Sequence, residues 1–401
     1  MTQLIPDGPP GVSEPVSASR AGGAELPRSS QRPLCEAYDV ALLDLDGVVY
    51  LGAAAVPGAT RALAQARRRG MRLAFVTNNA SRSPSAITAQ LDRIGVPADA
   101  AEVVTSAQAA AHLLADRLPA GAPVLVVGGI GLRIALRERG LRPVSTAADR
   151  PAAVVQGYGP DVGYPLLAEA ALAVRAGAWF VASNADATLP TARGLQPGNG
   201  SLVQVIVTAT GRRPLVAGKP EPPLHAEAVE RTGARRPLVV GDRLDTDVEG
   251  AVRVGAHSLL VLTGVTPPAG AVLAPPHQRP TYLAQDLAGL LEPQPAVTAT
   301  ADGFRCAGWT ARLAGGHPDA PARAAGAPGG AAGAAARSVE TSASRDGRSG
   351  SASHARPARI EIAGSGAAID GLRALCAAAW TAEAVSADSV RSAVGQLSFP
   401  A

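Results

Sequence analysis

Short continuous apolar runs recur between residues 38 and 291, and most are separated by stretches whose apolar residues fall every third or fourth position. The runs are residues 40–45, RLAFVT, PVLVVG, AAVVQG, WFVAS, RPLVVGD and SLLVLTG. A run with no polar face is typical of a parallel strand that is covered on both sides. Intervening stretches such as GATRALAQARRRG and SAITAQLDRIG have helical periodicity. This alternation predicts an α/β fold with a Rossmann-like parallel sheet.

The two ends of the chain differ from this pattern. Residues 1–36 are rich in Pro, Gly and Ser without periodicity, and residues 315–356 are mostly Ala, Gly, Ser, Pro and Arg. Neither stretch has enough apolar surface for a core, so we expect a disordered leader and a disordered insertion. Around the insertion, GWTARLAG and ARIEIAGSG indicate strands and IDGLRALCAAAW indicates a helix. We therefore expect residues 297–314 and 357–395 to form a small C-terminal α/β appendage.

Polar side chains follow the first two apolar runs where each predicted strand ends. The first run leads into DLDG, which contains Asp44 and Asp46. The second ends in Thr77 and continues into Asn78 and Asn79. Open α/β sheets bind their ligands at the carboxyl ends of the strands, so these side chains are candidates for a site. The alternative is ordinary turn chemistry, because Asp-Gly is common where strands end.

Two further signals lie in the second half of the chain. The run VVGD ends in Asp242, with Asp245 and Asp247 just behind it at the start of a predicted helix. Lys219, in VAGKPEP, is the only lysine of a chain whose other basic residues are arginine and six histidines. A lysine on an exposed turn could survive such a composition by chance. Its place just before the VVGD strand favours a functional role.

Composition excludes several classes of protein. The net charge is +4 and the pI about 9.3, but the arginines are spread through helices and tails and aromatic residues make up 3%, which disfavours nucleic-acid binding. Three cysteines without CxxC or Cys/His spacing indicate neither a disulfide framework nor a zinc site. The sequence shows no signal peptide and no apolar run of about 20 residues. We expect a cytoplasmic protein without a membrane partner.

Read in order, DLDGVVY, VTNNAS, AGKP and GDRLDTD resemble the four motifs of the haloacid dehalogenase superfamily of phosphohydrolases. The resemblance covers residues 38–291 and implies a core formed by residues 37–119 and 213–292. The insertion at residues 120–212 is similar to the large inserted α/β cap of subfamily IIA. Segments such as FVTNNASRS, LPTARGLQPGNGS and GWTARLAG are most similar to the actinobacterial glycerol 3-phosphate phosphatases.

The resemblance implies a role for each motif residue. Asp44 is the expected nucleophile, because a carboxylate that attacks phosphorus forms an aspartyl phosphate and divides the reaction into two steps. Asp46 is the expected general acid and base, which requires the clustered carboxylates to raise its proton affinity. Mg²⁺ is the expected cofactor, held by the Asp44 and Asp242 carboxylates and the Asp46 backbone carbonyl. Asp247 is expected to orient waters or the Lys219 ammonium.

Substrate contacts are expected from the second motif, the lysine and the cap. The residues implied are Thr77, Asn78, Asn79, Lys219, Asn184 and Asp186, and of these Thr77 and Lys219 are also expected to be catalytic. The cap loops QGYGPDVGYP and SNADATLPTARG are expected to face the site, although their polar residues could equally cap the following turn. A closed cap with few aromatic residues favours a small phosphorylated metabolite. Glycerol 3-phosphate is the first expectation, and 2-phosphoglycolate or a nucleotide or sugar phosphate is the alternative.

Two other functions carry similar signals. A phosphoaccepting receiver module also has acidic residues, a threonine and a lysine at strand ends, but the second aspartate of DLDG and the long cap argue against it. A nucleotide-dependent oxidoreductase would need a complete glycine loop, and VVGGIGLRIA has Ile134 at the third glycine position. His225 is interpreted as a structural histidine. The sequence leaves homo-oligomerisation open.

Overall fold

The computed structural model describes residues 26–191, 193–314 and 357–399. The predicted insertion at residues 315–356 and most of the predicted leader lie outside these residues. The last part of the leader differs from expectation, because residues 26–36 pack on the core. Ser30 pairs with Gln294, and helix α1 (Leu34–Ala37) buries Leu34 and Cys35. These two apolar side chains belong to the core cluster, and backbone hydrogen bonds from Arg28 and Ser30 also hold the segment, although no periodicity surrounds it.

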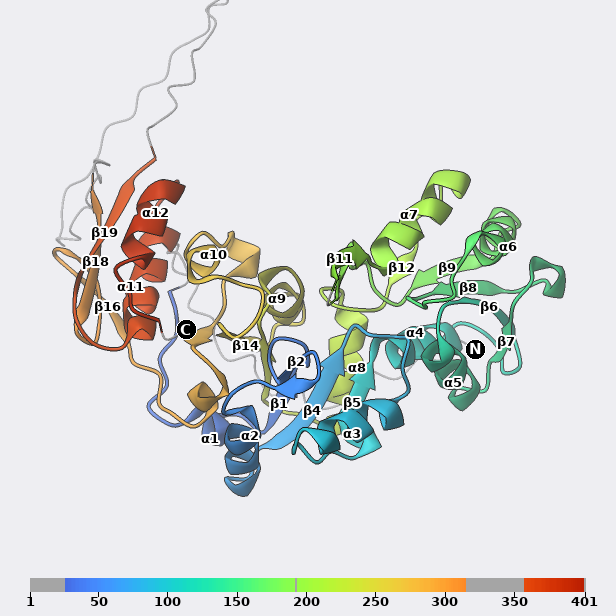
Figure 1. Ribbon diagram of the computed structural model, residues 1–401, viewed down its shortest axis with the longest axis horizontal. Helices are drawn as coiled ribbons and strands as arrows, with labels where there is room; N and C mark the ends of the chain where they lie inside the picture. The colour runs from blue at the N-terminus through green and yellow to red at the C-terminus, as the bar shows by residue number, and fades with distance from the viewer. Residues whose placement is uncertain (1–25, 192, 315–356, 400–401) are drawn as a thin grey trace, which may run out of the picture.

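A six-stranded sheet forms the centre of the molecule, between the cap at one end and the C-terminal module at the other (Figure 1). All its strand pairs are parallel, as the continuous apolar runs predicted. In spatial order the strands are β15 (Tyr282–Ala284), β14 (His257–Val261), β13 (Pro237–Gly241), β1 (Val40–Leu43), β4 (Arg72–Thr77) and β5 (Val103–Thr105). A short hairpin of β2 (Tyr50–Leu51) and β3 (Ala54–Ala55) follows β1.

Helices cover both faces of this sheet, which explains why its strands have no polar side. Successive residues of β1 point into different clusters, with Ala41 and Leu43 on one face and Val40 and Leu42 on the other. The first face packs against α1, α2 (Ala59–Arg68) and α3 (Pro84–Arg93). The second packs against α4 (Ser106–Ala115), α8 (Pro222–Thr232) and α9 (Glu249–Arg253).

The cap is built on a second parallel sheet. Its strands, in spatial order, are β12 (Leu215–Val216), β9 (Trp179–Ala182), β8 (Ala153–Gln156), β6 (Pro123–Val127) and β7 (Arg142–Val144). Helices α6 (Tyr164–Arg175) and α7 (Asn199–Thr210) cover one face, and α5 (Ile130–Glu138) covers the other. A hairpin of β10 (Thr188–Thr191) and β11 (Gly194–Pro197) extends from the cap. Because β12 belongs to this sheet, the cap sheet continues past residue 212, where the sequence placed its end.

Core and cap meet along helices α4 and α5, which contribute to one apolar cluster. Beside it, the buried Glu227 of α8 accepts hydrogen bonds from Arg139 and Arg231 at 3.0 and 2.6 Å and contacts His112 of α4. Arg139 directly follows α5, so this ion network crosses the seam between core and cap. The cap is therefore attached at one edge by both packing and charge.

The C-terminal module is an antiparallel sheet with two helices. Its strands are β16 (Val297–Thr300), β17 (Gly303–Cys306), β18 (Trp309–Ala314) and β19 (Arg359–Gly364), and its helices are α11 (Ala368–Trp380) and α12 (Ala387–Val394). The two predicted strands GWTARLAG and ARIEIAGSG are confirmed as β18 and β19, which pair with each other. The module packs on α10 (Pro268–Val272) of the core. None of the described helices is long and apolar enough to cross a membrane.

Candidate active site

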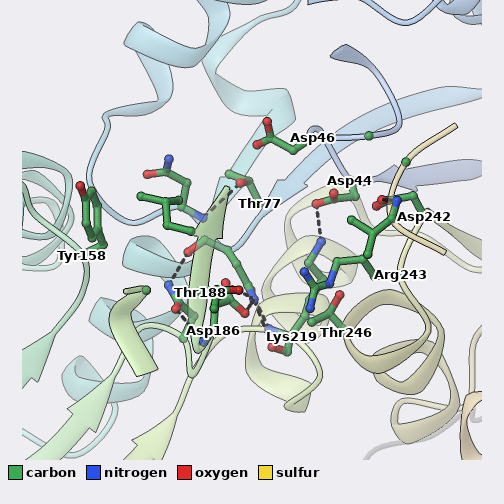
Figure 2. A pocket seen from close by; sticks show the side chains of 18 of the residues that line it. Asp44, Asp46, Thr77, Tyr158, Asp186, Thr188, Lys219, Asp242, Arg243 and Thr246 are labelled. Carbon is green, nitrogen blue, oxygen red and sulfur yellow. Dashed lines mark hydrogen bonds and ion pairs between the residues drawn. The ribbon is translucent and has the colours of Figure 1, made fainter. Parts of the chain in front are cut away.

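Three neighbouring strands carry the predicted motif residues to one edge of the core sheet. Because β13, β1 and β4 are adjacent and parallel, their carboxyl ends place Asp242, Asp44 and Thr77 side by side (Figure 2). Lys219 reaches the same edge from a different direction, since it follows the cap strand β12. The structure therefore brings together residues that are up to 198 positions apart, from Asp44 to Asp242.

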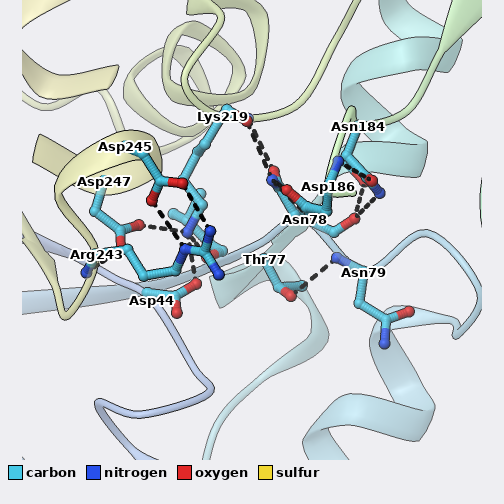
Figure 3. Close-up of polar contacts among 12 residues, drawn as sticks. Asp44, Thr77, Asn78, Asn79, Asn184, Asp186, Lys219, Arg243, Asp245 and Asp247 are labelled. Atoms are coloured by element: carbon cyan, nitrogen blue, oxygen red, sulfur yellow. Dashed lines mark hydrogen bonds and ion pairs between the residues drawn. The ribbon is translucent and has the colours of Figure 1, made fainter. Parts of the chain in front are cut away.

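The Lys219 ammonium lies at the centre of this group (Figure 3). Its Nζ donates to Asp44 Oδ1 at 2.5 Å, to Asp247 Oδ1 at 2.7 Å and to the Val76 carbonyl oxygen at 3.3 Å. The side chain is 3% exposed. Burial lowers the pKa of Lys219, but the Asp247 and Asp44 carboxylates outweigh burial and hold it above its ordinary value. The ammonium is therefore a fixed positive charge next to the predicted nucleophile.

Asp247 is oriented by a single π-helical turn at Leu244–Val248, directly after β13. Such turns insert one extra residue per turn and often occur at functional sites. Asp247 Oδ2 accepts from the Arg243 backbone N–H at 3.2 Å, so both of its oxygens have protein partners. Asp247 therefore lies where it could orient the Lys219 ammonium, and this role stays a prediction. Asp245 pairs instead with the Arg243 side chain at 2.8 Å, with more than half of its own side chain exposed.

Asp242 has one oxygen held and one oxygen without a protein partner. Oδ2 accepts from the Val265 backbone N–H at 2.6 Å, whereas the buried Oδ1 has no hydrogen bond. Two glycines leave room for this carboxylate. A Cβ atom on Gly264 would fall 2.0 Å from Asp242 Oδ2, and one on Gly47, at φ +84°, would fall 2.5 Å from it. Burial and the Asp247 carboxylate raise the pKa of Asp242 to about 6.

The donor set fits a hard divalent cation. Carboxylate oxygens of Asp44, Asp242 and Asp247 lie within 4.8 Å of one another. Both oxygens of Asp247 accept hydrogen bonds from the protein, whereas Lys219 contacts only Oδ1 of Asp44. Asp44 and the unpartnered Oδ1 of Asp242 are therefore the natural carboxylate ligands. A buried acceptor with no partner is costly unless a donor or a cation satisfies it. Oxygen donors of this kind are the ligands that Mg²⁺ prefers.

Asp46 and Thr77 face the cavity beside the nucleophile (Figure 2). The Asp46 side chain is open to the cavity. Desolvation by the surrounding walls raises its pKa above the usual value, although Lys219 and Arg82 oppose this. The Thr77 hydroxyl oxygen accepts from the Asn79 backbone N–H at 3.1 Å, which leaves its own hydrogen free for a ligand. Asp46 is therefore suited to hold a proton, and Thr77 is suited to donate a hydrogen bond.

A cavity of about 760 Å³ extends from these residues to the cap. Its lining includes the only lysine of the chain and all four of its asparagines, which are Asn78, Asn79, Asn184 and Asn199. Both predicted cap loops contribute to it, through Tyr158 of the first and the segment from Asn184 to Thr191 of the second. Asn199, Tyr158, Thr188 and Arg243 were not among the predicted site residues. For Asn199, the scarcity of asparagine was a signal that could have identified it.

The predicted substrate contacts do not all face the cavity in the same way. Asn78, Asn184 and Asp186 line it, but their polar atoms bind one another and the Lys219 main chain. Asn79 accepts from the Ser81 backbone N–H at 2.9 Å, which closes a local turn. Burial raises the pKa of Asp186 above its ordinary value, although the hydrogen bond from Asn78 opposes this shift.

Comparison with known proteins matches the chain in three segments. A family model described as haloacid dehalogenase-like hydrolase matches residues 41–142, and a HAD-hydrolase-like model matches residues 216–290. A GCN5-related N-acetyltransferase-like domain model matches residues 353–398, which overlap the C-terminal module. This last resemblance was not expected from the sequence.

Similar proteins extend these matches. D-glycerol 3-phosphate phosphatase of Mycobacterium tuberculosis is 53% identical over 259 residues, which are 65% of this chain and 72% of that protein. Acid sugar phosphatase of Staphylococcus aureus is 39% identical over 231 residues, which are 57% of this chain and 88% of that protein. The crystal structure of an M. tuberculosis glycerol phosphate phosphatase in complex with magnesium has a TM-score of 0.74 at 40% identity, over 92% of this chain and 99% of that one. The 4-nitrophenylphosphatase of Thermotoga maritima has a TM-score of 0.60 at 30% identity, over 64% and 98% of the two chains.

The chain agrees with these relatives in both sequence and structure. Identity with the first relative is above one half over 259 residues, which are nearly three quarters of its length. The predicted family resemblance and the parallel α/β fold are thereby confirmed. The chain belongs to the haloacid dehalogenase-like hydrolases.

Proposed function

We propose that this chain is a Mg²⁺-dependent phosphomonoester hydrolase that works through an aspartyl phosphate on Asp44. The placement of Lys219 carries the proposal, since its ammonium joins Asp44 to Asp247 at the carboxyl ends of adjacent strands. Phosphoryl transfer needs an in-line nucleophile, neutralisation of charge and a proton for the leaving oxygen. The names of the M. tuberculosis and S. aureus relatives support this function.

In the first step, a carboxylate oxygen of Asp44 attacks phosphorus. A new bond forms between that oxygen and phosphorus, and the bond from phosphorus to the ester oxygen breaks. Asp46 donates its proton to the departing alkoxide, which leaves as an alcohol. The raised pKa of Asp46 supports this role, because the carboxyl group must be protonated when the substrate binds.

In the second step, water attacks the phosphorus of the aspartyl phosphate. Asp46, now ionised, accepts a proton from this water, and the bond between phosphorus and Asp44 breaks. Inorganic phosphate leaves, and both carboxyl groups return to their starting states. Throughout, Lys219 holds Asp44 and offsets the charge of the phosphoryl oxygens, and the Thr77 hydroxyl donates to one of them.

Mg²⁺ would be held by the Asp44 and Asp242 carboxylates and the Asp46 backbone carbonyl. When bound, it supplies positive charge that reduces the repulsion between the phosphate and the carboxylates. Val265 and Gly264 keep Asp242 in place for this purpose, through one backbone hydrogen bond and one close approach of the chain.

Glycerol 3-phosphate is the substrate we propose. The cavity offers hydroxyl and amide groups on the cap side, such as Tyr158, Thr188 and Asn199. Among the described residues that line it, Tyr158 is the single aromatic side chain that could stack on a base, which favours a small polar substrate. The name of the M. tuberculosis relative supports the same choice. Phosphoglycolate is the alternative of similar size, and a sugar phosphate is favoured by the name of the S. aureus relative.

A cytoplasmic location and independence from nucleic acids complete the proposal. The three cysteines, Cys35, Cys306 and Cys376, are buried free thiols, which a reducing compartment preserves.

Replacement of the nucleophile tests the mechanism. We expect Asp44→Asn to release no phosphate from p-nitrophenyl phosphate, because an amide oxygen is a poor nucleophile. The change is isosteric and lies at the cavity wall, so circular dichroism should show an intact fold. Wild-type release should also disappear when Mg²⁺ is removed with a chelator. Ordinary turnover by folded Asp44→Asn would rule out the covalent mechanism.

A panel of esters tests the substrate. The ratio kcat/KM measures discrimination between competing substrates, so we expect its highest value for glycerol 3-phosphate in saturating Mg²⁺. The panel includes 2-phosphoglycolate, a hexose phosphate and a nucleoside monophosphate. A clear preference for any of these three would replace the proposed substrate and leave the phosphatase mechanism in place.

A further inference from the structure

The side chain of Asn78 is occupied by protein partners on all sides (Figure 3). Its Nδ2 donates to the Asp186 carboxylate at 3.1 and 3.3 Å and to the Lys219 carbonyl oxygen at 3.1 Å. Its Oδ1 accepts from the Lys219 backbone N–H at 2.8 Å. An asparagine amide has two N–H groups, and both are used here. Asn78 therefore has no donor left for a substrate, although it lies directly beside Thr77.

The path of the chain explains why the Lys219 main chain needs support. Strand β12 ends at Val216 in the cap sheet, and the Ala217 backbone N–H still donates to the Ala182 carbonyl oxygen at 2.9 Å. Lys219 follows two residues later, yet its ammonium binds Asp44 in the core. Any movement of the cap relative to the core must be absorbed in part in this short return, since the other connection is the one between α4 and β6. Asn78 holds both the N–H and the C=O of Lys219, which fixes that residue to the end of β4.

Asn78 also forms hydrogen bonds with the cap loop that contains Asn184 and Asp186. Asp186 and Asn184 belong to the loop after β9, and Asn184 Nδ2 donates to the Asn78 carbonyl oxygen at 2.8 Å. The contact is tight at Gly218, where a Cβ atom would fall 2.5 Å from the Ser183 carbonyl oxygen and 2.6 Å from Asn78 Oδ1. The cap loop at Ser183, the chain at Gly218 and the Asn78 side chain are therefore in close contact, with no space for a side chain at Gly218.

We propose that Asn78 is a positioning residue that couples the seating of the cap to the placement of the Lys219 ammonium, with Asp186 as its contact on the cap. We call this group, formed by Asn78, Asn184, Asp186 and the Lys219 main chain, the core–cap latch. The inference rests on the proposed phosphatase function, because the ammonium it positions acts on the phosphoryl group. It assigns Asn78 and Asp186 to holding the closed site, in place of direct substrate contact.

An exchange of charge between the two partners tests the latch. Asn78→Asp places a carboxylate against that of Asp186 and should lower kcat by about tenfold to a hundredfold, the effect of a small misplacement of a catalytic group. Asn78→Asp combined with Asp186→Asn restores one amide and one carboxylate with their positions exchanged. We expect kcat to recover by up to about tenfold relative to Asn78→Asp alone, and not to the wild-type value, because a carboxylate at position 78 still cannot donate to the Lys219 carbonyl oxygen.

Two substrates separate positioning from substrate binding. Glycerol 3-phosphate has hydroxyl groups on its leaving group, whereas the leaving group of p-nitrophenyl phosphate has none. A positioning role lowers kcat for both esters, because Lys219 serves the phosphoryl group that they share. If Asn78→Asp instead raised KM for glycerol 3-phosphate alone, Asn78 would be a substrate ligand and the proposal would fail.

The control is the neighbouring asparagine. Asn79 accepts from Ser81, and no hydrogen bond joins it to Asp186 in the described part of the chain, so Asn79→Asp combined with Asp186→Asn should show no recovery relative to Asn79→Asp. A double-mutant cycle on the free energy of unfolding at positions 78 and 186 measures the same coupling without turnover. If the wild-type chain released no phosphate, the proposed function would fail while the cycle still reported on the latch. Additive effects of the substitutions at positions 78 and 186, both on kcat and on the free energy of unfolding, would overturn the proposed core–cap latch.

Discussion

Lys219 has as many acceptors as its ammonium has hydrogens. Two are carboxylate oxygens of Asp44 and Asp247, and the third is the Val76 carbonyl oxygen. The three directions diverge from one nitrogen atom, which suits a compact rotatable group. A guanidinium is planar, wider and presents its donors as a fork. With the side chain 3% exposed, the surrounding protein leaves little space for this larger group.

Lys219→Arg should therefore lose most activity although the charge is kept. We expect kcat to fall by about a hundredfold or more, comparable with the loss of a preorganised donor in other enzymes. The measurement is phosphate release from p-nitrophenyl phosphate in saturating Mg²⁺, with thermal unfolding as the check on folding. Near-normal kcat in the arginine variant would show that the site needs only a positive charge.

Gly264 is the second residue whose size matters. An alanine there would place its Cβ 2.0 Å from Asp242 Oδ2, so the carboxylate would have to move. We expect Gly264→Ala to weaken Mg²⁺ binding by about tenfold to a hundredfold, as changes around metal ligands commonly do. The dissociation constant can be measured by calorimetric titration.

Gly270→Ala is the matched control for this glycine. A Cβ atom there would lie 3.4 Å from its nearest neighbour, which is ordinary van der Waals contact, and metal affinity should be unchanged. Equal affinity in the two variants would remove Gly264 from the account of the Asp242 site.

Rarity was the most informative signal at the residue scale. The single lysine and all four asparagines line one cavity. In a chain that otherwise uses arginine, these rare side chains therefore mark the positions of the site. The sequence identified Asn78, Asn79 and Asn184 because they lie beside strand ends or in a motif-rich cap loop. It missed Asn199, whose surroundings PGNGS indicate only a turn. The contacts of Asn78 with Asp186 could not be predicted either, because they depend on how the cap is oriented.

At the scale of elements, the strands that carry the motifs were predictable and the short connecting strands were not. β1, β4 and β13 are apolar on both faces because helices cover both sides of the sheet, and this leaves a clear mark in the sequence. The hairpin of β10 and β11 contains Pro190, Pro197 and Gly194 and pairs only with itself. Such a hairpin has no alternating pattern to detect, although it supplies Thr188 and Thr191 to the cavity.

The packing of α8 against α9 gives a prediction about pH. His225 of α8 is 1% exposed and contacts Gly250 of α9, where a Cβ atom would fall 2.6 Å from its ring. Burial, with the Lys219 charge, lowers the pKa of His225 to about 4. In the unfolded chain the His225 side chain has its ordinary pKa of about 6.5. Between about pH 6.5 and pH 4 the unfolded chain therefore takes up a proton at His225 that the folded chain does not. Stability is therefore highest above about pH 6.5 and falls as the pH drops toward 4.

His225→Gln should remove this part of the acid sensitivity. We expect the free energy of unfolding of the wild type to fall by up to about 3 kcal/mol between about pH 7 and pH 4 through this residue. The measurement is urea denaturation of both proteins across that range. The difference between them isolates His225 from other groups that titrate there. Parallel curves for the two proteins would contradict the assignment.

At the scale of the whole molecule, the C-terminal module shares its apolar core with the catalytic domain. Val248, Leu260 and Val272 of the core belong to the same buried cluster as Leu372 and Trp380 of the module. The sequence predicted the strands and the long helix of the module, since their patterns are local. It could not predict this contact, because the two sides are about a hundred residues apart and neither needs the other to form its own pattern.

Trp380 is the side chain that best tests this contact. It is 3% exposed, and its Nε1 donates to the Ala271 carbonyl oxygen of α10 at 3.3 Å. Helix α10 directly follows the segment that binds Asp242 through Val265 and Thr266, whose backbone N–H donates to the Asp242 carbonyl oxygen at 3.1 Å. Packing around Trp380 therefore supports α10 and, through the segment before it, the position of Asp242.

Trp380→Ala should destabilise the protein by about 3–5 kcal/mol, the usual cost of removing a buried tryptophan. Trp380→Phe keeps most of the packing and loses one hydrogen bond, so its cost should be about 1 kcal/mol. Arg312→Ala is the control within the module, since its ion pair with Glu361 spans 3.7 Å with both side chains more than half exposed, and such pairs contribute little. Urea denaturation measures the free energy of unfolding of all three variants.

Mg²⁺ titration of the folded variants measures the effect on the Asp242 site. We expect Trp380→Ala to weaken Mg²⁺ binding as well as stability, because α10 connects Trp380 to the segment that holds Asp242. Lost stability with unchanged Mg²⁺ affinity would confine the module to a stabilising role.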